Sequence, residues 1–223
     1  MRLLFIGNSY TARHDLPRLI AEMAASATPP CSIESELIFA GGASLRRHWN
    51  AGRALAAIER GGWDYVILQE QSTLPIKNRV RFHENVRLFD AAIRDAGAAT
   101  ALYLTWARAG SPMLQEAITR AVTDIADDLH ALVIPAGVAW QAVLRDHPEI
   151  ALHLPDGSHP TSAGAYLTAC VFVATLLGVS PIGLAVPRAL ALEQATASVL
   201  QRCADAAVRH GGPGNERAGV RAT

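Results

Sequence analysis

The stretch Leu3-Leu4-Phe5-Ile6-Gly7-Asn8-Ser9-Tyr10-Thr11 decides how the rest of this chain is interpreted. Its first four residues are all apolar, which is typical of a short buried strand. Glycine and asparagine follow at once, and both residue types commonly form turns. A helical pattern then opens near Asp15. The stretch therefore predicts the first strand and turn of an α/β unit, with Ser9 exposed just beyond the end of the strand.

Short apolar runs alternate with longer periodic stretches along the whole chain, which is typical of a parallel α/β sheet. Strands are expected at residues 2–7, 36–40, 65–69, 101–106 and 131–135. Helices are expected at residues 15–27, 44–60, 79–96, 112–129, 138–146, 162–177 and 189–209. This order predicts a flavodoxin-like three-layer α/β/α sandwich around a five-stranded parallel sheet. We expect one domain over residues 1–210 and a disordered tail over residues 211–223, which lack apolar periodicity.

Composition restricts the partners of this 223-residue chain. Its 20 basic and 20 acidic residues balance, so charge gives no reason to expect nucleic acid as a partner. No segment reaches the roughly 18–20 uninterrupted apolar residues of a transmembrane helix, so no membrane insertion is expected. The apolar run at the N-terminus is too short for a signal peptide. Three cysteines at wide spacings indicate neither a disulfide framework nor a zinc site, so we expect a cytoplasmic protein.

A second segment, Asp156-Gly157-Ser158-His159-Pro160, gives Ser9 a chemical meaning. A serine hydroxyl is a weak nucleophile that needs an adjacent base, which in turn is oriented by a third group. His159 and Asp156 are the candidates for base and orienting group. Each half alone has an ordinary explanation, because Gly-Asn-Ser is common turn chemistry and Asp156 or Thr161 could cap the next helix. Their presence in one α/β chain favours a Ser9-His159-Asp156 catalytic triad.

Two further segments follow predicted strands and could stabilise an anionic intermediate. Gly42 lies in a turn after the second strand, where a glycine lets backbone N–H groups approach a ligand. Gln69-Glu70-Gln71-Ser72 follows the third strand, and a side-chain amide there could donate to an oxyanion. An ordinary turn and a solvated strand end are the alternatives for these segments.

A metal site receives little support from the sequence. The eight histidines show no ligand spacing such as H-x-x-x-H. A cluster of His153, Asp156 and His159 is the one alternative that the spacing permits. We therefore expect neither a metal nor a cofactor.

The motifs together resemble those of the SGNH/GDSL hydrolases, and the order of the motifs is also that of the family. Gly7-Asn8-Ser9-Tyr10-Thr11 is similar to the nucleophile block G-D-S-[LIF]-[ST], with Asn8 in place of the aspartate. Gly42 resembles the second-block glycine that donates an N–H to the oxyanion hole, and Asp156-x-x-His159-Pro160 matches the final block. The third block, G-x-N-D, is not matched, because Gln69-Glu70-Gln71-Ser72 has no asparagine.

The resemblance implies a serine esterase with an acyl-enzyme at Ser9 and a small-molecule ester as substrate. It implies that the N–H groups of Ser9 and Gly42 form the oxyanion hole. Gln71, or less favourably Gln69, would replace the missing asparagine, since Gln71 lies further past the buried strand.

For the substrate we expect a short acyl group on a polar, carbohydrate-like alcohol. Asn8, Tyr10 and Trp106 are expected to contact this substrate. Aromatic surface from three tryptophans would suit a sugar, although each tryptophan could equally belong to the core; these are Trp49, Trp106 and Trp140.

Other classes of protein are alternatives. A non-catalytic module that binds a carbohydrate-like small molecule is supported by the missing asparagine of the third block. A nucleotide-binding or phosphotransfer protein is less well supported, because the chain has no G-x-x-x-x-G-K-[ST] motif.

Overall fold

The computed structural model describes residues 1–211. Only Gly211 of the predicted C-terminal tail falls within these residues, and there it ends a helix. Residues 212–223 of that tail lie outside the described residues.

Five parallel strands form one sheet in the order β2-β1-β3-β4-β5. Their bounds are β1 Arg2–Gly7, β2 Glu34–Phe39, β3 Tyr65–Leu68, β4 Ala99–Tyr103 and β5 Leu132–Ile134. Strand β1 is an inner strand, since it pairs with β2 on one side and with β3 on the other. This order is the flavodoxin-like one, and ligands bind in such sheets beyond the carboxyl ends of the strands where the order reverses. The predicted fold class is confirmed.

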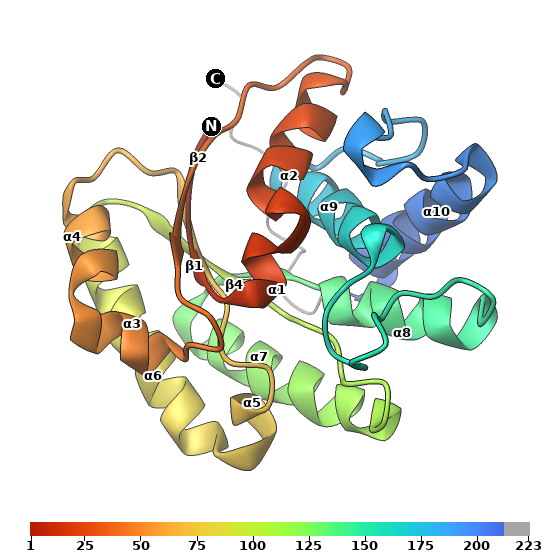
Figure 1. The fold of residues 1–223 in the computed structure, drawn as a ribbon. Helices are drawn as coiled ribbons and strands as arrows, with labels where there is room; N and C mark the ends of the chain where they lie inside the picture. The colour runs from red at the N-terminus through yellow and green to blue at the C-terminus, as the bar shows by residue number, and fades with distance from the viewer. Residues whose placement is uncertain (212–223) are drawn as a thin grey trace.

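Helices cover both faces of the sheet, which makes three layers (Figure 1). One face carries α1 Ser9–Ala12, α2 Leu16–Ala25, α8 Ala136–Asp146, α9 Ser162–Leu177 and α10 Gln194–Gly211. The other face carries α3 Leu45–Ala51, α4 Arg53–Glu59, α5 Leu74–Lys77, α6 Arg79–Asp95 and α7 Gln115–Leu129. Short 3₁₀ turns are η1 Arg13–Asp15, η2 Pro112–Leu114 and η3 Arg188–Leu190.

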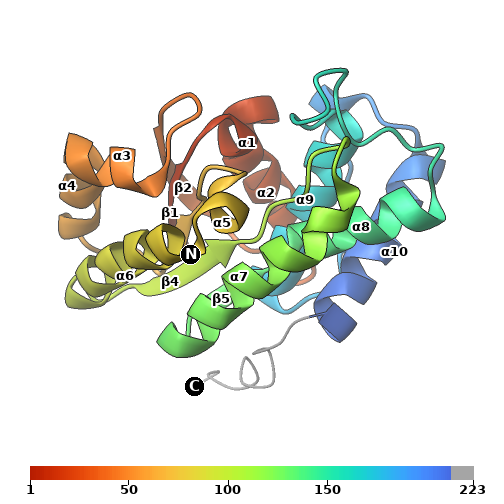
Figure 2. The same cartoon turned by 90° about the horizontal axis from the view of Figure 1, so that it is seen from below.

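Successive side chains of β1 point to opposite faces of the sheet and so contribute to two hydrophobic cores, one on each face. Leu3 and Phe5 pack in the core under α2 and α9, while Leu4 and Ile6 pack in the core under α4 and α6. Helix α9 is buried along almost its whole length, so its sequence is apolar on every side. Figure 2 shows α9 between the sheet and α10. Within residues 1–211, no helix combines the length and the apolar character that crossing a membrane requires.

The structure corrects several predicted element bounds. The single helix expected at residues 44–60 is two helices, α3 and α4, because Gly52 adopts a left-handed φ of 73° between them. The fourth strand ends at Tyr103, so Trp106 lies in the loop that follows it. The last helix begins at Gln194 and not at residue 189. Helix α5 was not predicted, since it has only four residues.

Candidate active site

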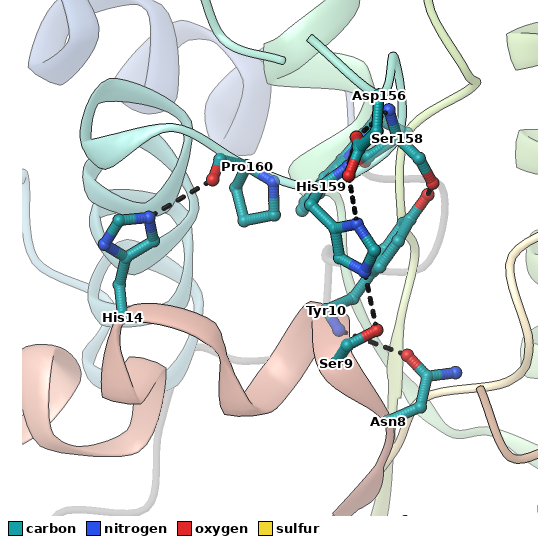
Figure 3. A network of polar contacts seen from close by, with 9 residues as sticks. Asn8, Ser9, Tyr10, His14, Asp156, Ser158, His159 and Pro160 are labelled. Carbon is teal, nitrogen blue, oxygen red and sulfur yellow. Dashed lines mark hydrogen bonds and ion pairs between the residues drawn. The ribbon is translucent and has the colours of Figure 1, made fainter. Parts of the chain in front are cut away.

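The three candidate catalytic residues meet at the carboxyl end of the sheet (Figure 3). Ser9 is the first residue of α1 and directly follows the turn after β1. Asp156 and His159 lie in the loop between α8 and α9. The fold therefore brings together the side chains of Ser9 and His159, which are 150 positions apart in the chain.

A continuous chain of hydrogen bonds joins Ser9, His159 and Asp156. The distance from His159 Nε2 to Ser9 Oγ is 2.8 Å, and that from His159 Nδ1 to Asp156 Oδ2 is 2.7 Å. A carboxylate only accepts hydrogen bonds, so Nδ1 carries the proton. Nε2 is then the free acceptor for the serine hydroxyl. Geometrically, His159 is placed to remove a proton from Ser9.

Backbone N–H groups hold Asp156 in its ionised form. Its Oδ1 accepts hydrogen bonds from the N–H groups of Ser158 and His159, both at 2.9 Å. The His159 N–H, the His159 imidazole and the Ser158 N–H together hold the pKa of this carboxyl well below its usual range. Asp156 therefore places a negative charge beside the His159 ring, where it could stabilise an imidazolium.

Thr161, and not Asp156, is the residue that caps the helix after this loop. Its side chain caps α9 by accepting a hydrogen bond from the N–H of Gly164 at 3.1 Å. Asp156 is left to bond within its own loop and to His159.

The turn that carries Ser9 is held by buried polar groups. Asn8 is only 3% exposed; its Oδ1 accepts from the Tyr10 N–H and its Nδ2 donates to the Ala43 carbonyl at 3.0 Å. These bonds use the polar side-chain atoms of Asn8 inside the protein. The predicted substrate contact of Asn8 is therefore not supported. Asn8 instead ties the nucleophile turn to the loop that carries Gly42.

Gln69 holds the same turn from the side of β3. Its Oε1 accepts from the Asn8 N–H at 2.8 Å and from the Thr11 hydroxyl at 3.1 Å, and its Nε2 donates to the Glu70 carbonyl. A Cβ added at Gly7 would lie 2.8 Å from Gln69 Oε1, so only glycine permits this approach. Gln69 is 1% exposed, and its contacts indicate support of the turn and not donation to an oxyanion.

The remaining oxyanion candidates keep unused donors. Ser9 begins α1, and the N–H groups of a first helical turn have no partner within the helix. Within residues 1–211, neither the Ser9 nor the Gly42 N–H has a hydrogen-bond acceptor. Gln71 Oε1 accepts from the Thr73 N–H and hydroxyl, both at 3.0 Å. The Gln71 amide nitrogen has no partner in this part of the chain, so of the two glutamines Gln71 keeps the free donor.

Two buried residues near the nucleophile were not singled out by the sequence. Glu70 Oε1 accepts from the N–H groups of Leu45 and Gln71, and its Oε2 accepts from Asn85 Nδ2. Burial raises the pKa of Glu70 despite these bonds. His48 Nε2 donates to the Gly7 carbonyl at 2.9 Å, and burial lowers the pKa of this imidazole. Glu70 lies two residues past the end of the buried strand β3, and a charged residue at such a place is the signal that could have identified it.

Tyr10 and Trp106 are both buried. They are 4% and 1% exposed, and their rings stack at 4.8 Å with an interplanar angle of 6°. Trp140 stacks on the other face of Trp106 at 3.6 Å, whereas Trp49 contacts Phe89 elsewhere in the molecule. The expected contacts of Tyr10 and Trp106 with substrate stay predictions, since both rings are buried while Trp106 also lines a cavity together with Trp140 and His153.

No group of three or more histidine, cysteine, aspartate or glutamate side chains in residues 1–211 is arranged to hold a metal ion. The His153 imidazole bonds to a different part of the loop structure, since its Nε2 donates to the Ala107 carbonyl at 3.1 Å.

Comparisons with known proteins agree with the fold. No protein-family model matches the chain, and no curated protein matches its sequence. A solved structure of a candidate SGNH hydrolase from Slackia heliotrinireducens is 29% identical, with a TM-score of 0.69 over 79% of this chain and 98% of that one. A DUF4886 family protein from Bacteroides uniformis is 20% identical, with a TM-score of 0.75 over 94% of this chain and 95% of that one.

An acetylxylan esterase from Geobacillus stearothermophilus is 17% identical, with a TM-score of 0.60 over 78% of this chain and 93% of that one. The two less identical structures show the shared fold alone. The similarity to the Slackia protein confirms the resemblance to the SGNH/GDSL hydrolases that the motifs predicted.

Proposed function

From this fold and resemblance, we propose that the protein is a serine esterase that hydrolyses a carboxylic ester through an acyl-enzyme at Ser9. The observation that carries the proposal is the hydrogen-bond chain from Ser9 through His159 to Asp156, with links of 2.8 and 2.7 Å. Binding a ligand would not require a serine, a base and an ionised carboxylate in this arrangement. A cytoplasmic location, a single domain over residues 1–210 and the lack of a cofactor are further predictions from the sequence.

In the first half-reaction, Ser9 Oγ attacks the carbonyl carbon of the ester and its proton moves to His159 Nε2. The negative charge that develops on the carbonyl oxygen is stabilised by the N–H groups of Ser9 and Gly42 and by the amide of Gln71. His159 then gives its proton to the departing alcohol oxygen, which leaves an acyl group on Ser9. Asp156 stabilises the imidazolium throughout.

In the second half-reaction, water attacks the acyl carbon while His159 Nε2 accepts a proton from that water. Collapse of the intermediate breaks the bond to Ser9 Oγ, and His159 returns the proton to the serine. The products are a carboxylic acid and the free enzyme. No step needs a metal or a cofactor.

For the substrate, we propose a short acyl group, such as acetyl, on a polar or carbohydrate-like alcohol. Support comes from the structural neighbours, among which are esterases named for acetylxylan and for acetyl-xylooligosaccharides. The aromatic surface expected from the sequence gives no support, because Trp106 and Trp140 are buried.

The direct test is hydrolysis of p-nitrophenyl acetate and p-nitrophenyl butyrate by the wild type and by Ser9→Ala. Turnover is expected in the wild type, with the acetate preferred, and it should vanish in the variant while circular dichroism remains unchanged. A matched control is Ser198→Ala, since Ser198 lies on α10 and its hydroxyl donates to the Gln194 carbonyl within the same helix. Full activity in Ser9→Ala would refute the assignment of the nucleophile.

A binding module for carbohydrate-like ligands is a second candidate, and it is favoured by the absence of the third-block asparagine. Acetylated xylooligosaccharides separate the two functions, with proton NMR used to follow free acetate. An esterase releases acetate and stops doing so in His159→Ala. A binding module retains the ligand intact, with equal affinity in both proteins.

A further inference from the structure

The loop that carries the candidate base is a small hairpin. The Leu154 N–H donates to the His159 carbonyl at 2.8 Å, and His153 forms an isolated antiparallel bridge with Pro160. The hairpin thus presents two histidines, one in each of its arms.

Three stacked aromatic rings lie between these two histidines. Tyr10, Trp106 and Trp140 form the stack, with the Trp106 ring in the middle. The His153 ring meets Trp140 edge-on at 5.0 Å, and the His159 ring meets Tyr10 edge-on at 5.7 Å. The hairpin is therefore packed around an aromatic column that ends against the catalytic imidazole.

Three successive residues of the hairpin also bond to the segment that follows β1 (Figure 3). Ser158 Oγ and the Tyr10 hydroxyl are 2.7 Å apart, and His14 Nε2 donates to the Pro160 carbonyl at 3.2 Å. Between these two contacts lies the bond from His159 to Ser9. The Ser158 carbonyl also accepts from Trp106 Nε1 at 3.0 Å, so the same residue is fixed from the aromatic column.

We propose that Tyr10 and Ser158 are positioning residues that hold His159 in register with Ser9. Tyr10 follows Ser9 in the chain, and Ser158 precedes His159. The hydrogen bond between Tyr10 and Ser158 therefore joins the same two segments as the bond between Ser9 and His159, one residue away. Both are buried, at 4% and 8% exposure, which shields this bond from water. The inference rests on the proposed esterase function.

The bond matters most in the acyl-enzyme. Once Ser9 Oγ carries an acyl group it has no proton to donate, and the hydrogen bond between Ser9 and His159 is lost. The Tyr10 hydroxyl remains bonded to Ser158 in that state and keeps the imidazole at the acyl carbon. Deacylation, in which His159 must activate water, is therefore the step that depends on this contact.

Tyr10→Phe tests the proposal, because it removes the hydroxyl and keeps the stacked ring. We expect kcat for p-nitrophenyl acetate to fall roughly 10- to 100-fold, since misplacing a catalytic group by about 1 Å has effects of that size. Deacylation should slow more than acylation, so a burst of p-nitrophenol should appear. Ser158→Ala should behave alike, and the double variant should lose no more than either single variant.

Tyr166→Phe is the matched control. Tyr166 is equally buried, and its hydroxyl accepts from Gln201 Nε2 at 2.7 Å in the contact between α9 and α10. It should lose stability as Tyr10→Phe does and keep wild-type kcat. The proposal would be overturned if Tyr10→Phe kept the wild-type kcat and showed no larger burst than the wild type. Losses that add in the double variant would overturn it as well.

A readout that does not depend on turnover separates this inference from the esterase function. The His159 Nδ1 proton, assigned by its loss in His159→Gln, should give a sharp, slowly exchanging NMR signal in the wild type. The signal should broaden in Tyr10→Phe and persist in Tyr166→Phe. If the wild type hydrolyses no ester yet the signal behaves in this way, the positioning role stands and the proposed function fails. An unchanged signal in Tyr10→Phe refutes the positioning role itself.

Discussion

Asp156 and Glu70 lie at the same end of the sheet, and each accepts three hydrogen bonds, yet their pKa values move in opposite directions. Asp156 takes two backbone N–H groups and the His159 imidazole, and its pKa is lowered. Glu70 takes two backbone N–H groups and the Asn85 amide, and its pKa is raised. Solvent explains the difference, because the Asp156 side chain is 47% exposed while Glu70 is 6% exposed.

The comparison shows that the number of hydrogen bonds does not define the role of a carboxylate. Desolvation penalises the charge of Glu70 more than its three neutral donors favour it. Asp156 keeps its hydration and faces a ring that becomes positive during the reaction. Asp156 is therefore suited to catalysis, and Glu70 is suited to joining the end of β3 to the start of α3.

The largest expected effect is that of Asp156→Asn. An amide can present either a donor or an acceptor to Nδ1, so it no longer fixes the tautomer or stabilises the imidazolium. We expect kcat to fall by about 10⁴ with little change in KM, as measured with p-nitrophenyl acetate. The counterpart Glu70→Gln should lose less than tenfold. Equal losses in the two variants would contradict the division of roles.

The next largest effect separates the two glutamines after β3. Gln71→Leu should lower kcat roughly 10²- to 10³-fold with unchanged stability, since one oxyanion donor is lost. Gln69→Leu should lower the free energy of unfolding by about 1–3 kcal/mol, because the Asn8 N–H and the Thr11 hydroxyl lose a buried acceptor. Urea denaturation together with steady-state kinetics measures both. Wild-type kcat in Gln71→Leu would exclude that side chain from the oxyanion hole.

The pH dependence should also differ between the two carboxylates. The folded-state pKa of Asp156 lies below its ordinary value of 3.8, so its contribution to stability is present above that pH and is lost on further acidification. Since Asp156 stays charged at mildly acidic pH, it should add no ionisation to the acidic limb of the pH profile of kcat/KM, which a single titration should describe. A second ionisation in the acidic limb of that profile would argue against this assignment.

The smallest effect concerns the raised pKa of Glu70. Here the folded-state pKa lies above the ordinary value of 4.5, so the contribution of Glu70 to stability is greatest below that pH and declines as pH rises through the folded pKa. Glu70→Gln keeps an oxygen for the two backbone N–H groups, and it should flatten this decline. Urea denaturation across the pH range measures the effect, and a decline as steep as in the wild type would assign it to another group.

Local patterns in the sequence were sufficient for the layout of the fold. Strand β1 has the predicted bounds, and α9 begins and ends where the sequence predicted, because an apolar run flanked by glycine or threonine punctuation is a local signal. The break at Gly52 was missed, since an isolated glycine within a helical pattern is often tolerated. The triad residues were predicted from motif spacing, and the structure brings their side chains within hydrogen-bond distance.

The sequence could not separate residues that touch a ligand from residues that support those that do. Trp106 follows a strand and was expected at the pocket, but Trp140, which covers it, is 34 positions away along the chain. Gln69 and Gln71 differ by two positions, and only the fold shows which amide is already bonded. Such distinctions depend on tertiary neighbours, which local patterns do not contain.

The most direct test of the esterase proposal is covalent labelling with a fluorophosphonate, followed by mass spectrometry of the digested protein. The proposal predicts one adduct, on the peptide that contains Ser9, and much slower labelling in His159→Ala, whose serine has no base. An unlabelled Ser9 in the folded wild type, or equal labelling in His159→Ala, would contradict an activated serine and refute the proposed mechanism.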